Sequence, residues 1–166
     1  MQIRTATDDD WPSIYPFFRE IVAAGETYAY PLDLSSEAAA DLWMEQLPSL
    51  TVVAVAIDDT GVETVLGSAK TGPNRPARGS HVATASFMVD PAAQGRGVGR
   101  ALATYVVQWA REQGFRSMQF NAVVETNTAA VALWQDLGFR IIGTVPEAFD
   151  SVSHGLVGLH VMHLRL

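Results

Sequence analysis

The residues with the clearest chemical meaning form one glycine-rich run, Gln94-Gly95-Arg96-Gly97-Val98-Gly99-Arg100-Ala101. The run follows an apolar, strand-like stretch from His81 to Val89 and leads into a helical pattern of apolar residues that begins at Val98. Glycines let the backbone turn tightly, so successive N–H groups converge at the positive end of the new helix. The sequence therefore predicts a binding site for a diphosphate that needs no lysine.

Two common phosphate-binding motifs differ from this run. A P-loop has Lys and then Ser or Thr after its last glycine, whereas this chain has Arg100 and Ala101 after Gly99. A dinucleotide fingerprint has a third glycine where Arg100 stands, and it normally lies in the first strand-turn-helix unit of a domain. We therefore expect neither a Walker-type nucleotide site nor a Rossmann domain.

Residues for acid–base chemistry are scattered along the chain, and each of them taken alone is more often a surface residue than a catalyst. The candidate general bases are Glu26, Glu125, Asp150 and His154. The absence of cysteine excludes disulfides, thiolate metal sites and a cysteine nucleophile. His160 and His163 are three residues apart in a predicted strand, so they point to opposite faces and we expect no metal site.

Composition limits the class of protein. With 166 residues, of which 48% are hydrophobic, the chain fits one compact domain spanning residues 1–166. The formal net charge of −7 argues against nucleic-acid binding, which relies on clustered Lys and Arg. No apolar run is long enough to span a membrane and the N-terminus has no apolar signal region, so we expect a cytoplasmic protein without a membrane partner.

These residues must be positioned by alternating strands and helices, which the apolar periodicity and the turn residues predict. The predicted helices cover residues 11–24, 35–46, 97–113 and 128–137. The predicted strands lie at the N-terminus and at 51–57, 62–70, 81–89, 116–124, 139–145 and 156–166. Between them we expect an exposed, mobile loop from Thr71 to Ser80 and a polar connection from Pro146 to Gly155.

The segment from Gln94 to Gly99 resembles the Q/R-x-x-G-x-G/A signature of the GCN5-related N-acetyltransferase (GNAT) family. The stretch from Asn127 to Phe139 also resembles the helix and Gly-Phe element of that family, and two motifs at compatible spacing arise by chance less readily than one. The resemblance implies a single-domain GNAT fold of the α/β class. It also implies a mixed, mostly antiparallel central sheet of about seven strands, about four helices, and acetyl-CoA as the cofactor.

The resemblance assigns cofactor binding to the strand before the glycines and to the glycine turn itself. In the family, backbone groups at the distorted end of this strand contact the acetyl group and the pantetheine, and the matching residues are Phe87, Met88 and Val89. Asn127 matches an asparagine that touches the cofactor, and it also suits the cap of the helix that follows. The residues implied around the diphosphate are Gln94, Gly95, Arg96, Gly97, Val98, Gly99 and Arg100.

The segment from Phe120 to Asn127 further resembles the branch of the family that includes fungal acetyltransferases of proline analogues such as azetidine-2-carboxylate. The resemblance implies that Asn121 faces the acceptor as a catalytic-site residue. That branch tends to have another asparagine where this chain has Thr84. Many family members have a tyrosine general acid where this chain has Trp134, and an indole cannot be that acid.

The acceptor pocket of the family follows its first helix, where this chain has Glu26-Thr27-Tyr28-Ala29-Tyr30-Pro31. Glu26, Tyr28 and Tyr30, together with Thr84, are therefore predicted substrate-side residues. The general acid stays unassigned, because Tyr28, Tyr30 and Tyr105 cannot be ranked from sequence.

Together these features predict an acetyl-CoA-dependent N-acetyltransferase that modifies a small-molecule amine by direct attack on the thioester. The acceptor would be an amino acid, an amino-acid analogue or a related amine. Two alternatives stay open: a non-catalytic acyl-CoA sensor, suggested by Trp134 and the missing acid, and an acetyltransferase of protein N-termini or lysines. Family resemblance also suggests a homodimer formed through the C-terminal strands.

Overall fold

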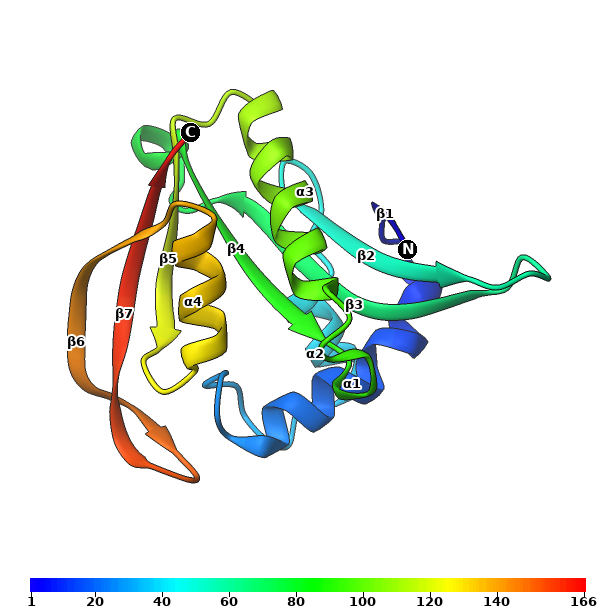
Figure 1. The fold of residues 1–166 in the computed structure, drawn as a ribbon, viewed down its shortest axis with the longest axis horizontal. Coiled ribbons are helices and arrows are strands. Elements are labelled where there is room, and N and C mark those ends of the chain that lie inside the picture. Colours follow the sequence, from blue (N-terminus) through cyan, green and yellow to red (C-terminus); the bar gives the residue numbers. More distant parts are fainter.

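A computed structural model describes all residues from 1 to 166 (Figure 1). The order of its helices and strands follows the order that the apolar periodicity predicts. The α-helices are α1 (Trp11–Ala24), α2 (Ser36–Trp43), α3 (Val98–Glu112) and α4 (Thr128–Asp136). The strands are β1 (Gln2–Thr5), β2 (Leu50–Ile57), β3 (Glu63–Pro73), β4 (Val82–Val89), β5 (Ser117–Val124), β6 (Arg140–Ser151) and β7 (Gly155–Arg165).

The seven strands form one mixed sheet in the order β1-β2-β3-β4-β5-β7-β6. Every neighbouring pair is antiparallel except β4 and β5, which run parallel in the middle of the sheet. Parallel neighbours need a crossover connection, and α3 supplies it here. This arrangement confirms the predicted α/β fold with a mostly antiparallel sheet of seven strands and four helices.

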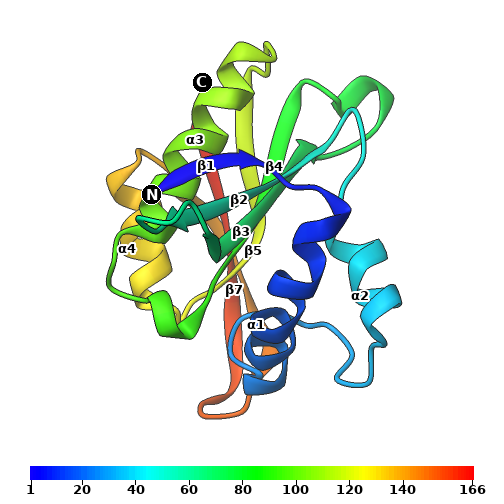
Figure 2. The same cartoon turned by 90° about the vertical axis from the view of Figure 1, so that its right-hand side faces the viewer.

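The sheet separates two apolar layers, and alternate residues of β2 show the division (Figure 2). Val52 and Ala54 pack with α3 and with Trp134 of α4, whereas Val53 and Val55 pack with α1 and α2 on the opposite face. All four of these β2 side chains are fully buried. None of the helices combines the length and the apolar character needed to cross a membrane.

The helix starts follow from local chemistry, and one helix end differs from the prediction. Ser35 caps α2 by accepting a hydrogen bond from the Ala38 N–H at 3.2 Å. The helix then ends at Trp43, three residues before the predicted end, because the Thr51 hydroxyl donates to the Trp43 carbonyl and accepts from the Glu45 N–H. These two bonds lead the chain out of the helix and toward β2.

Two predicted connections are wrong in part, because one or both of their ends belong to strands. Thr71 was expected in an exposed loop, but it lies in β3, is buried, and donates its hydroxyl to the Thr84 carbonyl at 2.9 Å. The segment after Val145 was expected to be a polar connection, but β6 continues to Ser151, which pairs with Gly155 of β7. Because β6 is the edge of the sheet and is mostly exposed, its polar side chains are solvated and do not interrupt the strand.

Candidate functional site

The central feature of the site is the divergence of β4 from β5. The two strands pair only through Val82 with Ser117 and Ala83 with Met118. Beyond these pairs they separate, with α3 following β4 and α4 following β5 (Figure 1). The second half of β4 therefore has backbone N–H and C=O groups on its β5 side that no strand satisfies.

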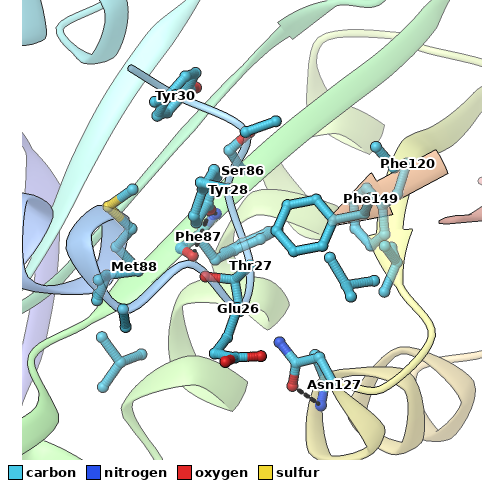
Figure 3. Close-up of a pocket in the computed structure, with 18 of the residues that line it drawn as sticks. Glu26, Thr27, Tyr28, Tyr30, Ser86, Phe87, Met88, Phe120, Asn127 and Phe149 are labelled. Atoms are coloured by element: carbon cyan, nitrogen blue, oxygen red, sulfur yellow. Dashed lines mark hydrogen bonds between the residues drawn. The ribbon is translucent and has the colours of Figure 1, made fainter. Parts of the chain in front are cut away.

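A cavity of about 670 Å³ lies at this divergence, and its wall brings together residues that are far apart in the sequence. Of the predicted acceptor-side residues, Glu26, Tyr28, Tyr30, Thr84 and Asn121 line it. Of the predicted cofactor residues, Phe87, Met88, Val89, Gln94 and Asn127 line it. Figure 3 shows Glu26, Thr27 and Tyr28 on the segment that crosses the cavity, with Met88 to one side and Phe120 and Phe149 to the other.

The orientation of the β4 backbone distinguishes neighbouring residues of this strand. The Asn74 N–H donates to the Val82 carbonyl and the Asp90 N–H donates to the Leu66 carbonyl, so even-numbered β4 residues bond to β3. By the alternation of an antiparallel ladder, the N–H and C=O of Met88 also face β3, whereas those of Phe87 and Val89 face the divergence. The Met88 side chain is buried in the layer formed by α1 and α2.

The glycine turn presents free donors at the start of α3. The first intrahelical bond runs from the Ala101 N–H to the Gly97 carbonyl, and no side chain caps the helix. The N–H groups of Val98, Gly99 and Arg100 therefore have no acceptor within the protein.

The turn also has room for an anion. Gly95 and Gly97 have φ of 73° and 77°, and a Cβ placed on either would meet no atom within 4 Å. Together with the free donors of α3, this space fits a diphosphate group.

Charged and amide side chains flank the glycine turn. Arg96 is exposed, and Arg100 is paired with Asp136 of α4 at 2.8 Å while remaining about half exposed. Asn127 caps α4 by accepting a hydrogen bond from the Ala130 N–H at 3.2 Å, and it lines the cavity at the same time. The two positive side chains and the free N–H groups favour an anionic ligand at this end.

The Glu26 carboxylate, on the predicted acceptor side of the cavity, binds the hairpin between β6 and β7. It accepts hydrogen bonds from the Ser151 hydroxyl at 2.6 Å, from the Ser153 hydroxyl at 2.7 Å and from the Ser153 N–H at 2.9 Å. His154 Nδ1 lies 3.8 Å from the same carboxylate. The hydrogen bond from Ser151 is the main reason why the pKa of Glu26 is lowered, so this side chain is ionised at neutral pH. These contacts join the segment after α1 to the hairpin between β6 and β7.

Asn121 on β5 belongs to a chain of three amide side chains, one of which, Asn74, follows β3. Asn121 Nδ2 donates to Asn74 Oδ1 at 2.6 Å, and Asn121 Oδ1 accepts from Gln119 Nε2 at 2.8 Å. The β5–β7 register shifts between Phe120 and Val123, so Asn121 lies at an irregularity of the strand. One amide proton of Asn121 has no partner in this chain of contacts and is free to contact an acceptor molecule.

Aromatic side chains form the floor between the two ends of the cavity. Trp134 lies 4.8 Å from Phe87 and 4.9 Å from Phe120, measured between ring centroids, and Phe120 stacks on Phe139 at 4.3 Å. Trp134 is almost fully buried in this cluster. Its indole packs in this cluster, and the indole N–H is not acidic enough to protonate a leaving thiolate.

Tyr28 and Tyr30 stack at 5.4 Å between ring centroids, but their hydroxyls differ. The Tyr28 hydroxyl donates to the Phe87 carbonyl at 2.7 Å and accepts from the Phe87 N–H at 3.1 Å. Burial raises the pKa of Tyr28, and the neighbouring Tyr30 raises it further. Burial also raises the pKa of Tyr30. Both phenols therefore stay protonated at neutral pH.

The geometry agrees with what known proteins show. The model of the acetyltransferase (GNAT) family matches residues 11–139. The chain belongs to this family. A GCN5-related N-acetyltransferase from Kribbella flavida has 63% sequence identity and a TM-score of 0.93, over 99% of this chain and 97% of that one.

Two further acetyltransferases are similar to this chain. An L-methionine sulfoximine/L-methionine sulfone acetyltransferase of Pseudomonas aeruginosa is 31% identical, over 99% of this chain and 94% of its own length. A GNAT superfamily phosphinothricin acetyltransferase from Sinorhizobium meliloti, solved in complex with acetyl-CoA, is 25% identical with a TM-score of 0.85, over 99% and 88% of the two chains. Acetyl-CoA is accordingly the cofactor of this GNAT protein, and the free donors at the start of α3 fit its diphosphate.

Several residues of this GNAT site were not singled out from the sequence. Phe149 lines the cavity from β6, where the sequence predicted only a polar connection. Ser151 and Ser153 hold Glu26, and Asn74 holds Asn121. Their contacts span 47 to 127 positions of sequence, so no local pattern marks them. Only Phe149 carried a signal, because an isolated aromatic residue in a polar stretch often packs against a neighbouring element.

Proposed function

We propose that this protein is an acetyl-CoA-dependent N-acetyltransferase that acetylates the amine of a small molecule. The acceptor is an amino acid, an amino-acid analogue or a related amine, and its nitrogen attacks the thioester directly. Membership of the GNAT family supports the acetyl transfer, and the names of the two amino-acid-analogue acetyltransferases above support an acceptor of this size.

The observation that carries the small-molecule proposal is the closure of the acceptor-side wall. The Glu26 carboxylate binds Ser151 and Ser153, and the Val152 N–H donates to the Gly25 carbonyl at 3.2 Å. A protein acceptor would need an open groove along which an extended segment can lie. Four hydrogen bonds that join the segment after α1 to the β6–β7 hairpin favour a compact amine instead.

The residues of the cavity have separate roles in this proposal. The glycine turn and the first residues of α3, together Gln94 to Arg100, bind the diphosphate of acetyl-CoA, and Asn127 lies beside it. The Phe87 and Val89 backbone groups hold the acetyl-pantetheine end. Bound acetyl-CoA supplies the activated acetyl group, and Asn121 and Thr84 face the amine that receives it.

Asn121 is the side chain with which to test the acceptor site. The assay is thiol release from acetyl-CoA against amino acids, proline analogues, polyamines and amino-bearing antibiotics. In Asn121→Ala we expect kcat/KM for the active acceptor to fall about 10-fold, because one hydrogen bond to a bound polar group is lost. Gln108→Ala removes an exposed amide that bonds only Glu112 on α3, and it serves as the matched control with unchanged kinetics.

The outcomes separate the alternatives. Turnover of one acceptor class that falls in Asn121→Ala but not in Gln108→Ala supports the proposal. Acetyl-CoA binding without turnover of any small amine contradicts it. Adding a panel of peptides then distinguishes a protein acetyltransferase, which releases thiol, from an acyl-CoA sensor, which does not.

A further inference from the structure

The Tyr28 hydroxyl occupies an unusual place, because both of its hydrogen bonds go to the backbone of one residue on β4. It accepts from the Phe87 N–H at 3.1 Å and donates to the Phe87 carbonyl at 2.7 Å. Phe87 lies beyond the last pair that joins β4 to β5. Tyr28 thus satisfies the very backbone groups that the divergence of the strands exposes.

None of the other tyrosines, nor Trp134, forms a hydrogen bond to the Phe87 backbone. The chain has four tyrosines. The Tyr15 hydroxyl is near the Leu34 carbonyl at 3.4 Å, and Tyr105 does not line the cavity. Tyr30 lines it but stacks between Tyr28 and Phe18 without a hydrogen bond to β4. Trp134 packs its ring against the ring of Phe87 and does not contact the Phe87 backbone through a hydrogen bond. Tyr28 is therefore the one aromatic side chain that presents a hydroxyl to the Phe87 backbone.

We infer that the Tyr28 hydroxyl is a catalytic hydrogen-bond donor that, with the Phe87 N–H, stabilises negative charge on the acyl oxygen during transfer. The inference rests on the proposed function. Because the Phe87 N–H donates to the Tyr28 oxygen, an acyl oxygen would share this N–H in a three-centre hydrogen bond, and a small rotation of the hydroxyl would turn its proton from the Phe87 carbonyl toward that acyl oxygen. Donors that are in place before charge develops are the most effective kind.

The transfer balances without a proton from Tyr28. The amine nitrogen forms the new bond to the acyl carbon with its lone pair, and the bond from carbon to sulfur breaks with its electron pair going to sulfur. The amine loses a proton to water and the CoA thiolate takes one from water. Tyr28 keeps its proton throughout, as its burial and raised pKa favour, and it acts only through its hydrogen bond.

The test compares Tyr28→Phe with Tyr15→Phe. Both changes remove one hydroxyl and keep the aromatic ring, but only the first removes a donor from Phe87, because the Tyr15 hydroxyl is near the Leu34 carbonyl and Tyr15 does not line the cavity. In Tyr28→Phe we expect kcat to fall about 100-fold, with the acceptor KM and the acetyl-CoA Kd within about 3-fold of wild type. Tyr15→Phe should keep wild-type kcat. An unchanged kcat in Tyr28→Phe, or an equal fall in both variants, would overturn the inference.

A second measurement needs neither turnover nor cofactor. Hydrogen exchange of the Phe87 amide in the free protein should be faster in Tyr28→Phe than in wild type or Tyr15→Phe, because the acceptor of that N–H is gone. Equal exchange in all three proteins would contradict the contact itself. Failure of the proposed function is distinguishable, because then wild type binds acetyl-CoA and turns over no amine. Failure of this inference alone leaves an active wild type and an equally active Tyr28→Phe.

Discussion

The cavity has two proposed ends, one for the cofactor and one for the acceptor, and they differ in which parts of the chain form them. The proposed cofactor end consists mainly of backbone: free N–H groups at the start of α3, and the Phe87 and Val89 groups on β4. The proposed acceptor end consists of side chains that three distant segments contribute, with Glu26 after α1, Asn121 on β5 and Ser151 on β6. One end is set by local geometry and the other by tertiary contacts.

This difference assigns two kinds of specificity to one cavity. A diphosphate can be held by any backbone that offers convergent N–H groups, so many side chains around the turn can change without loss of the cofactor. An acceptor amine is selected by particular polar atoms at particular places, so single side chains decide it. Substitutions at the two ends should therefore affect cofactor affinity and acceptor kinetics separately, and two variants test this directly.

Gly97→Glu should have the largest effect, on the cofactor end alone. Gly97 has φ of 77°, where a side chain costs about 1–2 kcal/mol, and the new carboxylate would repel a diphosphate. We expect acetyl-CoA to bind about 100-fold more weakly or not measurably by calorimetry. The control Gly61→Glu places the same residue at φ of 85° in the β2–β3 turn, with equal strain and equally open space. Wild-type affinity in a folded Gly97→Glu would contradict the diphosphate site.

Glu26→Gln should have an intermediate effect, on the acceptor end alone. The carboxylate accepts from Ser151 on one oxygen and from Ser153 on the other, whereas an amide has a single acceptor and would turn N–H groups toward one of these donors. We expect the acceptor KM to rise about 10-fold with unchanged acetyl-CoA affinity. Glu20→Gln neutralises another carboxylate on the cavity wall and serves as the control. An equal rise of the acceptor KM in Glu20→Gln would show that negative charge matters, and not the hydrogen bonds of Glu26 to Ser151 and Ser153.

The same contrast explains how much could be predicted from the sequence. The strand, glycine turn and helix from residue 82 to 112 were predictable, because glycine spacing and helical periodicity are local signals. The fold followed from the same signals and from family resemblance. The strand character of β6 beyond Val145 was not predictable, because an edge strand tolerates polar side chains that resemble a loop in the sequence.

The acceptor end was predictable only in part. Family resemblance placed Glu26, Tyr28 and Asn121 at the cavity wall, where they lie. Their partners could not be found, because the contact from Glu26 to Ser151 spans 125 positions and that from Asn121 to Asn74 spans 47. The two hydrogen bonds between the Tyr28 hydroxyl and the Phe87 backbone depend on the divergence of β4 and β5. The local sequence pattern does not predict where these strands separate.

The smallest expected effect concerns the pH dependence of the acceptor-side wall. The Ser151 hydrogen bond lowers the pKa of Glu26 below its ordinary value of 4.5. A group whose pKa is lower in the folded protein stabilises it above the unfolded pKa, and this stabilisation is lost as the pH falls through the folded pKa. Because Glu26 is only partly buried, we expect Glu26→Gln to lower Tm by no more than about 2 °C at neutral pH.

That Tm difference between wild type and Glu26→Gln should stay constant at pH values well above 4.5 and should close below it, as wild-type Glu26 takes up its proton. Asp10 and Asp58 also have lowered pKa values, through bonds from Arg4 and Thr60 respectively, but they titrate alike in both proteins and cancel in the difference. Thermal unfolding of both proteins at pH values above and below 4.5 measures this Tm difference. A Tm difference that grows on acidification would contradict the prediction. It would show that the ionised Glu26 carboxylate does not stabilise the contacts with Ser151 and Ser153.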